Sequence, residues 1–444
     1  MKVSRLPKDT GRSGWNAVLP EPASPTPLLG TVTADWLVIG AGVAGLAAAR
    51  RLAQIRDGDR IAVLDAVRVG TGPAGRNSGF MIDLPHDLAS ENYGGGIERD
   101  RAQIAANRRA IAFAMEVGDQ FGLGTEAISQ TGKINAAASE RGIAHNRNYA
   151  DHLEALGEPF EALDSQQMRS LTGSSYYKGG LFTPGTAMVQ PALFFRGVAA
   201  GLVSNRISIH EMSPVTGLTR TGSDWCATTP GGRVTAPRVI LAVNGHVESF
   251  GQFRRRLVHV HLYASMTRAL TREEIAAMGG EATWSLTPAD PMGTTVRRIN
   301  GIGGDRIVVR NRCDYTPGME TSTGRLEQVA RDHDQSLCNR FPALAGVTME
   351  YRWGGRLCMS LNDVPAWGEV DTGLFAACCQ NGLGLARGTL SGMAAAEAAV
   401  GLQTENTRFL AANHPPRRLP PEPLAWLGAT AKIRWGEIQA GPEL

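Results

Sequence analysis

Two short apolar runs near the N-terminus frame the most informative pattern in the chain. They cover residues 36–39 and 61–64, and the alanine-rich stretch between them opens with a glycine turn. Apolar runs of this length bounded by turn signals are typical of buried parallel strands, so the pattern predicts a strand–helix–strand unit over residues 34–66. Elsewhere the periodicity predicts helices near 97–121, 144–156, 191–203, 323–341 and 388–401, and strands within 207–229, 231–245, 257–270, 294–310 and 374–378.

The turn in this unit has the spacing of a dinucleotide-binding fingerprint. Gly40, Gly42 and Gly45 form a Gly-x-Gly-x-x-Gly motif, and Asp65 follows the second strand. The first glycine permits the tight turn, the second lets the backbone approach a pyrophosphate, and the third lets helix and strand pack closely. The helix N-terminus favours the pyrophosphate charge, and Asp65 stands where a carboxylate binds ribose hydroxyls. An ordinary strand–helix–strand unit with a glycine turn is the alternative.

Elements of this type recur in the middle and near the end of the chain, with strand-rich and helical segments between them. The pattern predicts one discontinuous cofactor domain interrupted by a substrate domain. The expected division is a proline-containing arm at 1–33, a cofactor domain at 34–100, 175–250 and 350–405, a substrate domain at 101–174 and 251–349, and a tail at 406–444.

The composition of the chain mainly excludes certain classes of protein and site. The 444 residues are 43% hydrophobic and 20% charged, with a formal net charge of +3, which is ordinary for a globular enzyme and too small to favour nucleic acid. The six cysteines form no CxxC pair and no zinc spacing, so neither a disulfide framework nor a metal site is expected. No apolar run reaches the length of a membrane span and no secretory signal is visible, so we expect a cytoplasmic protein.

Further motifs lie in loops and at strand ends. Residues 75–80 read GRNSGF, and Trp353-Gly354-Gly355 is followed by Pro365. These resemble the SGRNGGF loop and the WGG…P segment of the FAD-dependent D-amino-acid-oxidase-like oxidoreductases, and most closely the branch of gamma-glutamylputrescine oxidases. Residues 176–181, 241–245 and 415–428 are similar to that family's YYxGGL stretch, its LATNG strand end and the tail of that branch. The resemblance covers most of the chain.

The resemblance implies a mixed α/β fold, with a Rossmann-like FAD-binding domain and a substrate domain built on an antiparallel sheet over the flavin. It implies FAD as cofactor and oxidation of the C–N bond of an amine or amino acid, by hydride transfer to flavin N5 and hydrolysis of the resulting imine. Two alternatives stay open: an FAD-dependent dehydrogenase of a hydroxy acid or other non-amine donor, and a non-catalytic flavin-binding subunit.

By the same resemblance, cofactor contacts are expected at the glycine turn, at the GRNSGF loop, beside the adenine and at a turn before the last predicted helix. The backbone N–H groups and the arginine of the loop suit anionic phosphate and flavin oxygens, and those of the last turn suit flavin N1 and O2. The residues expected to contact the cofactor are Gly40, Gly42, Val43, Ala44, Gly45, Asp65, Ala66, Arg76, Asn77, Ser78, Gly79, Val215, Asn244, Gly354, Asn381, Gly382, Leu383 and Gly384.

For the substrate, the resemblance points to Arg298, with Arg297 as second choice, because an arginine near this position pairs with the substrate carboxylate in amino-acid oxidases of the family. A solvated strand arginine is the alternative. His259 and His261 lie two apart on a predicted strand and so share one side, a candidate for the substrate side of the flavin. Hydrogen-bonded structural histidines are the alternative. Cys358 is expected to be a buried thiol, and the FAD to be non-covalent.

The electron acceptor is expected to be oxygen or an unknown partner. Related sarcosine oxidases use a lysine to promote the reaction with oxygen, and this chain has no lysine between Lys178 and Lys432. The expected partner is a small-molecule amine or amino-acid substrate, with no nucleic acid and no membrane span.

Overall fold

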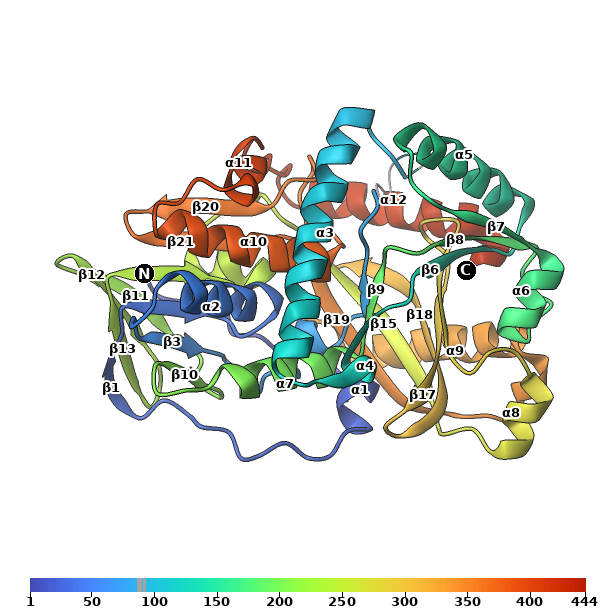
Figure 1. The fold of residues 1–444 in the computed structure, drawn as a ribbon, viewed down its shortest axis with the longest axis horizontal. Coiled ribbons are helices and arrows are strands. Elements are labelled where there is room, and N and C mark those ends of the chain that lie inside the picture. Colours follow the sequence, from blue (N-terminus) through green and yellow to red (C-terminus); the bar gives the residue numbers. More distant parts are fainter. Residues whose placement is uncertain (86–89, 91–92) are drawn as a thin grey trace.

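The largely parallel sheet at the left of Figure 1 is built from segments far apart in the sequence. In the computed structural model, which describes residues 1–85, 90 and 93–444, its strand order is β10-β3-β2-β14-β21-β20. All of its neighbouring strands are parallel except β20, which runs antiparallel to β21 at the edge. The bounds are Trp36–Ile39 for β2, Ile61–Leu64 for β3, Ile207–His210 for β10, Arg238–Leu241 for β14, Ala366–Asp371 for β20 and Leu374–Cys378 for β21.

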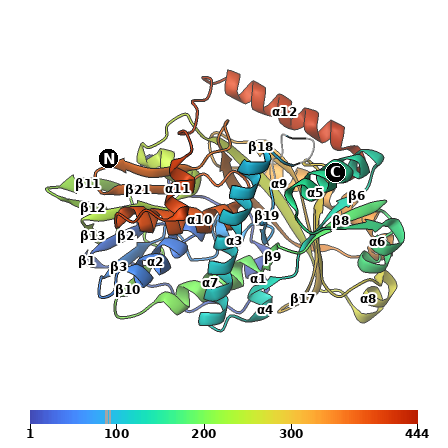
Figure 2. The ribbon, with the colours of Figure 1, turned by 45° about the horizontal axis from the view of Figure 1, so that its top comes forward.

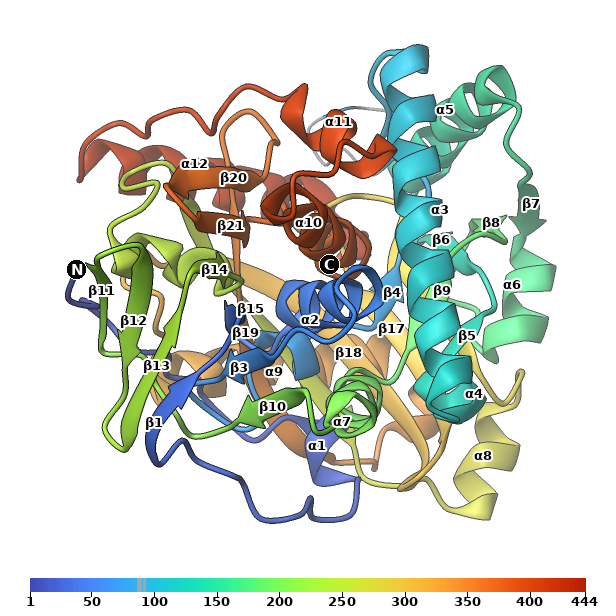
Figure 3. The same ribbon diagram turned by 60° about the vertical axis from the view of Figure 1, so that its left-hand side comes forward.

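Both faces of this sheet are covered, which is why its strands are apolar throughout. One face packs against α2, α3, α7 and α10, and the other against a four-stranded sheet, β1-β13-β12-β11 (Figure 3). Val38 and Val63 point to the helices, whereas Leu37 and Leu64 point to the second sheet. The bounds are Val43–Ile55 (α2), Ile97–Gln120 (α3), Pro191–Leu202 (α7), Gly384–Ala399 (α10), Gly30–Thr33 (β1), Gly217–Thr221 (β11), Asp224–Thr228 (β12) and Gly232–Ala236 (β13).

An eight-stranded sheet forms the right-hand part of the molecule, in the order β19-β15-β18-β17-β16-β6-β8-β7 (Figure 1). Its neighbouring strands are antiparallel except for β16 and β6. Helix α9 (Thr323–Arg340) packs against β15, β18 and β19. The strand bounds are Lys133–Ala137 (β6), Glu161–Asp164 (β7), Gly179–Thr183 (β8), Val258–Thr267 (β15), Trp284–Pro288 (β16), Thr295–Gly301 (β17), Gly304–Tyr315 (β18) and Met349–Met359 (β19).

Smaller elements connect the two large sheets and surround the second one. A three-stranded sheet, β4-β9-β5, comprises Phe80–Met81, Ala187–Val189 and Ile128–Gln130. The remaining helices in this part are α1 (Gly14–Ala17), α4 (Gly124–Ala127), α5 (Glu140–Leu156), α6 (Ser165–Thr172) and α8 (Arg272–Met278), with 3-10 turns η1 (Pro73–Gly75), η2 (Asn244–Phe250) and η3 (Pro342–Leu344).

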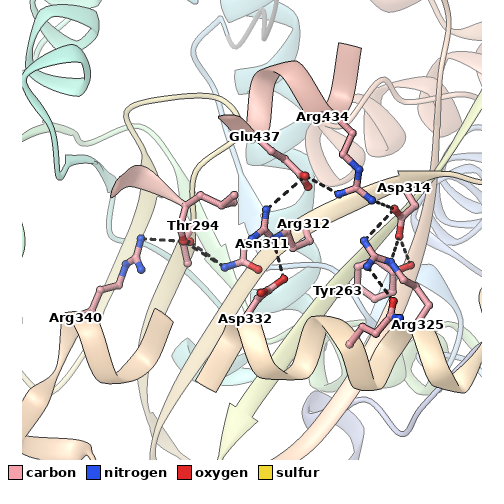
Figure 4. A network of polar contacts seen from close by, with 12 residues as sticks. Tyr263, Thr294, Asn311, Arg312, Asp314, Arg325, Asp332, Arg340, Arg434 and Glu437 are labelled. Carbon is pink, nitrogen blue, oxygen red and sulfur yellow. Dashed lines mark hydrogen bonds and ion pairs between the residues drawn. The ribbon is translucent and has the colours of Figure 1, made fainter. Parts of the chain in front are cut away.

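The last helices form an outer layer. Helix α11 (Glu405–Ala411) packs on α10, whereas α12 (Leu424–Ala440) lies on the outside of the molecule and packs against β18 (Figure 2). The polar network in Figure 4 holds α12 in place: Glu437 pairs with Arg312 of β18 and with Arg434 of its own helix. Beyond α12, in η4 (Gly441–Glu443), the Glu443 carboxylate accepts hydrogen bonds from the backbone N–H groups of residues 138 and 139.

The predicted fold class is confirmed: the chain combines a parallel dinucleotide-type sheet with a mainly antiparallel second sheet. The strands do not follow the predicted division of the chain. β8 and β19 belong to the eight-stranded sheet because they pair with β6 and β15, whereas the predicted cofactor segments 175–250 and 350–405 included them. The predicted tail, 406–444, contains the helices α11 and α12.

The contact between α2 and α10 depends on a glycine. A Cβ on Gly392 would lie 2.1 Å from the backbone oxygen of Ala44, so an alanine there must push the helices apart. We expect Gly392→Ala to destabilise the protein by about 1–3 kcal/mol, measured as a lower melting temperature. Gly324→Ala in α9 is the matched control, because nothing lies within 4 Å of that Cβ, and it should be neutral or slightly stabilising. Equal melting temperatures for the two variants would contradict this prediction.

Candidate functional site

A cavity of about 1140 Å³ is lined by both large sheets. On one side lie the carboxyl ends of β2, β3 and β14, the edge at which parallel sheets bind ligands. On the other side lie β15, β18 and β19, and residues of α12 and of the N-terminal arm complete the lining. The cavity therefore joins the glycine turn to the second sheet, and its volume exceeds that of an ordinary small-ligand pocket.

The glycine turn follows β2 and opens on this cavity. Gly40 has a φ of +103°, and a Cβ there would lie 2.5 Å from the oxygen of Ala242. A Cβ on Gly45 would lie 1.7 Å from the Gly40 oxygen, so both glycines are required by backbone packing. Gly42 differs, because the nearest atom to its Cβ would be the Ala74 Cβ at 3.8 Å. No side chain caps α2, which leaves N–H groups of its first turn available to an anion.

Asp65 lies at the end of β3, beside the turn. Its carboxylate accepts hydrogen bonds from the N–H groups of Ala41 at 2.7 Å and Val67 at 3.0 Å. Burial raises its pKa to about 6. A carboxylate oxygen can accept more than one hydrogen bond, so Asp65 keeps capacity for ribose hydroxyls. Val43, Ala44, Ala66 and Val215 line the same region.

The GRNSGF loop lines the cavity, but its arginine is used differently from the expectation. The Arg76 guanidinium donates to carbonyls of the N-terminal arm, of its own loop and of Gly354. It therefore fixes the loop to the arm and to β19 instead of presenting a free charge to a phosphate. Asn77 accepts a hydrogen bond from the N–H of Gly79 at 2.8 Å and so shapes the turn. Arg76, Asn77, Ser78 and Gly79 all contribute to the cavity lining.

The turn before α10 also opens on the cavity. Gly382 has a φ of +84°, and nothing lies within 4 Å of a Cβ on Gly382 or Gly384. No side chain caps α10. The side-chain oxygen of Asn381 accepts a hydrogen bond from the N–H of Ser360 at 2.7 Å. The bare helix N-terminus suits negative charge. Asn381, Gly382, Leu383 and Gly384 line the cavity as the sequence predicted for a ligand-facing turn.

Asn244 and Gly354 support the walls. The Asn244 Oδ1 accepts hydrogen bonds from the N–H of Cys379 at 3.1 Å and from the thiol of Cys358 at 3.2 Å. Cys358 is buried, and its hydrogen bond with Cys379 and its burial raise the pKa of its thiol. Gly354 is absent from the cavity lining, and a Cβ there would lie 2.3 Å from His261 Nε2. Its expected cofactor contact is thus replaced by a packing requirement.

His259 and His261 share one side of β15, but it is the side turned away from the cavity. The residues of β15 that alternate with them, Val260, Leu262 and Ala264, form the cavity wall. His259 is hydrogen-bonded to Glu248 at 2.7 Å, and burial lowers the pKa of His261 to about 4. The structure therefore places both histidines outside the cavity lining, and their substrate role stays a prediction.

Arg298 does not line the cavity. It pairs with Asp305 at 2.8 Å and donates to the carbonyls of residues 279 and 281, and it is buried. The Arg297 guanidinium also has partners within the protein, because it donates to the carbonyls of Ser78 and Val189 and stacks on Trp15. The donors of Arg298 already have partners in β18 and in the loop before β16, so the structure gives no support to its expected contact with a substrate carboxylate.

The cavity contains another arginine, which the sequence analysis missed. Arg310 of β18 lines the wall between Thr295 of β17 and Ala264 of β15. The other arginines of the lining have hydrogen-bond or ion-pair partners. Arg310 has none within residues 1–85, 90 and 93–444, and burial lowers its pKa. Alternation along 304–315 was visible in the sequence, but it does not tell which face meets a ligand.

Helix α12 is the second feature that the sequence analysis missed. Ala429, Ile433 and Gly436 contribute to the cavity lining, as does Lys432. The proline-rich segment before the helix favoured an extended tail. A run of small and apolar residues after Pro423 was the available signal.

Metal sites and membrane-spanning helices are two further features to consider. In the part of the chain that the structure describes, no group of three or more His, Cys, Asp or Glu side chains is placed to hold a metal ion. No helix in that part combines the length and apolarity needed to cross a bilayer.

Comparison with known proteins identifies the family. Residues 35–398 match the family model described as FAD dependent oxidoreductase (DAO). The gamma-glutamylputrescine oxidoreductase of Escherichia coli (strain K12) is 25% identical over 349 residues, which cover 78% of each chain. The probable oxidoreductase OrdL of Rhizobium meliloti is 25% identical over 414 residues, 90% of each chain. The glycine oxidase of Geobacillus kaustophilus has the same fold, with a TM-score of 0.70 at 18% identity, covering 86% of this chain and 99% of that one.

The residues present fit FAD. Gly42 leaves open space where a side chain would block a pyrophosphate, and the N-termini of α2 and α10 both reach the cavity without side-chain caps. Asp65 lies beside the first of these helices. The lining thus offers N–H groups for phosphate and for the flavin, and a carboxylate for ribose.

Gly42→Val tests this fit. A Cβ there would make only an ordinary van der Waals contact, with the Ala74 Cβ at 3.8 Å, so folding should be preserved while the backbone approach to the pyrophosphate is blocked. Loss of two charge-assisted hydrogen bonds, at about 1.5–3 kcal/mol each, predicts an FAD affinity lower by about 100-fold or more. The measurement is flavin titration of deflavinated protein.

Gly346→Val is the control, since its Cβ meets nothing within 4 Å and it lies outside the cavity lining. If Gly42→Val bound FAD as tightly as this control, the glycine turn would not hold the pyrophosphate.

Proposed function

Because the chain belongs to the DAO family of FAD-dependent oxidoreductases, we propose that it oxidises the C–N bond of an amine or amino acid that carries a carboxylate. FAD, when bound, supplies the acceptor for the hydride that leaves the C–H bond next to nitrogen. The imine product is hydrolysed by water.

The observation that carries this proposal is the continuity of the cavity. One volume connects the glycine turn of β2 and α2, the turn before α10 and the inner face of the eight-stranded sheet. A dinucleotide bound along the parallel sheet would therefore present its reactive end to the wall formed by β15 and β18. The apolar side chains Val260, Leu262 and Leu357 in that wall exclude water from the reacting C–H bond.

Arg310 is the residue proposed to hold the substrate. An unpaired guanidinium in a cavity wall is unfavourable unless an anion joins it. Carboxylate matches the planar fork of donors, and two parallel hydrogen bonds would fix the orientation of the substrate. Arg310 thus takes the role that the sequence analysis gave to Arg298.

The turn before α10 is proposed to stabilise charge. Its N–H groups and the positive end of the helix dipole face the cavity at residues 381–384. Donors fixed in this way favour a ligand whose negative charge increases during the reaction. The backbone therefore contributes without any proton transfer from a side chain.

The compartment and partners complete the proposal. All six cysteines are free, in agreement with a reducing cytoplasm, and the net charge of +3 gives no reason to add nucleic acid. The electron acceptor is oxygen or an unidentified carrier. Lys432 is a lysine of the cavity lining, so the absence of lysine between 178 and 432 does not exclude oxygen.

The substrate class is tested by anaerobic reduction of the bound flavin. Amino acids and carboxylate-bearing amines should bleach its absorbance, whereas simple cationic amines should not. The compounds tested include 2-hydroxy acids, since Arg310 would also hold their carboxylate. If these alone bleached the flavin, the proposed reaction would be alcohol oxidation instead of C–N oxidation. No bleaching by any member would favour a non-catalytic flavin-binding role.

Arg310 is tested with the substrate so identified. Loss of a charge-assisted fork worth about 1.5–3 kcal/mol should lower kcat/KM of Arg310→Ala about 10- to 100-fold. Arg310→Lys should recover part of this, because an ammonium lacks the planar fork. Flavin content should stay unchanged, and the exposed Arg220→Ala is the control. If Arg310→Ala kept the full kcat/KM on a carboxylate substrate, Arg310 would not be the residue that holds the substrate.

A further inference from the structure

The outward side of α12 carries a stripe of exposed apolar side chains. Leu424, Leu427, Trp435 and Ile438 have exposed fractions of 60%, 52%, 62% and 72%. Their spacing of three, eight and three residues, with Ala431 between them, places all of them on one side of the helix. Leu424 and Trp435 lie at the edge of this side and also line the cavity, whereas Leu427, Ala431 and Ile438 do not. We call these five residues the α12 stripe.

The opposite side of the same helix is apolar as well. Ala429, Ile433 and Gly436 line the cavity, and Glu437 is buried in its ion pairs with Arg312 and Arg434. A helix that is apolar on both sides is normally covered on both sides. Here the protein covers one side, and Figure 2 shows α12 at the outer edge of the molecule with its other side facing outward.

Exposed basic side chains border the stripe. Arg417 and Arg418 precede the helix, and Arg254 and Arg255 lie beside them because the Leu419 N–H donates to the Arg255 carbonyl at 2.7 Å. The result is an apolar stripe with a basic border at the N-terminal end of the helix.

The acids of segment 412–444 offset only part of this border, because Glu422 is exposed and stands against four arginines. Glu437 and Glu443 are buried, and Glu422 accepts hydrogen bonds from the Tyr315 hydroxyl at 2.7 Å and the Trp426 N–H at 3.0 Å. The side of α12 that faces outward is thus apolar and positively charged, and a partner with negative charge and apolar depth would complement both properties.

We propose that the α12 stripe binds an anionic lipid surface. Exposed leucine, isoleucine and tryptophan side chains with arginines at their border favour a position in the plane of an anionic membrane interface. Helices of this kind usually turn a polar face to water, and in α12 the protein itself covers the other face. From Leu424 to Ile438 the stripe extends about 21 Å at 1.5 Å per residue, which suits such a position along the surface.

Pairing with a second copy of this chain fits less well. A twofold interface brings the same patch of both copies together, so the four arginines of each basic border would share one interface, and Glu422 is the exposed acid that segment 412–444 sets against them. An anionic lipid surface supplies the missing negative charge. This proposal goes beyond the proposed reaction and does not depend on the substrate.

Vesicle sedimentation of the yellow holoprotein tests the proposal. We expect it to bind vesicles that contain phosphatidylglycerol, to bind vesicles of phosphatidylcholine alone much more weakly, and to be released by salt. The double variant Leu427→Ser, Ile438→Ser should bind the phosphatidylglycerol vesicles at least about tenfold more weakly, since both side chains would enter the lipid interface. Neither side chain lines the cavity, so the flavin site should not change. Arg417→Gln with Arg418→Gln should lose about 25-fold, at about fivefold per charge.

Matched controls lie far along the chain from α12. Leu29 is 78% exposed beside β1, so Leu29→Ser removes an exposed leucine elsewhere. Arg220→Gln with Arg233→Gln removes two exposed charges from β11 and β13. Both controls should bind as the unchanged protein does, and all variants should keep their flavin.

Three results would overturn the proposal. The first is no sedimentation with phosphatidylglycerol vesicles, and the second is binding that neither α12 variant weakens. The third is a dimer in light scattering that Leu427→Ser, Ile438→Ser dissociates while vesicles are not bound, which would make the stripe an interface between copies. If the serine variant lost its flavin through misfolding, the arginine variant and its control would decide alone.

Discussion

The close approach of backbones at the glycine turn is the constraint on which the rest of the cavity depends. A Cβ on Gly45 would lie 1.7 Å from the Gly40 oxygen, and one on Gly392 would lie 2.1 Å from the Ala44 oxygen. These contacts hold α2 against its strand and α10 against α2. Because the first turns of both helices open on the same cavity, two positive helix ends meet around one volume, and an anionic cofactor is the ligand that this arrangement favours.

The arginines of the second sheet show how the walls stay rigid without a ligand. Arg298 is paired with Asp305, and Arg297 donates to two carbonyls. The Arg297 guanidinium joins segments that are distant in the sequence, whereas Arg298 bonds to residues 279, 281 and 305 nearby. Removal of their partners would leave a buried charge uncompensated. Arg310 differs because its donors face the cavity. Arg297 and Arg298 are therefore held by internal ion pairs and hydrogen bonds, whereas Arg310 in the cavity wall has no such partner among the described residues.

Much of the fold was predictable because local patterns report local geometry. The apolar runs, the spacing of the three glycines and the GRNSGF loop were placed correctly on strands, turn and cavity lining. The substrate wall was not, because both sides of β15 are buried and alternation alone does not separate them. A register shift at Leu262 and Tyr263 further changes which residues of β18 stand opposite β15. Choosing Arg310 over Arg298 required the long-range pairing of strands, which no local pattern contains.

The place of α12 in the chain has a consequence for the order of biosynthesis. The glycine turn, the β15–β18 wall and the turn before α10 all precede residue 424, so they leave the ribosome before the helix that completes their cavity. Until α12 and η4 dock, through Glu437 on Arg312 and Glu443 on the start of α5, the cavity is open on that side. The side of the cavity that α12 lines is therefore the last part of the site to form during synthesis.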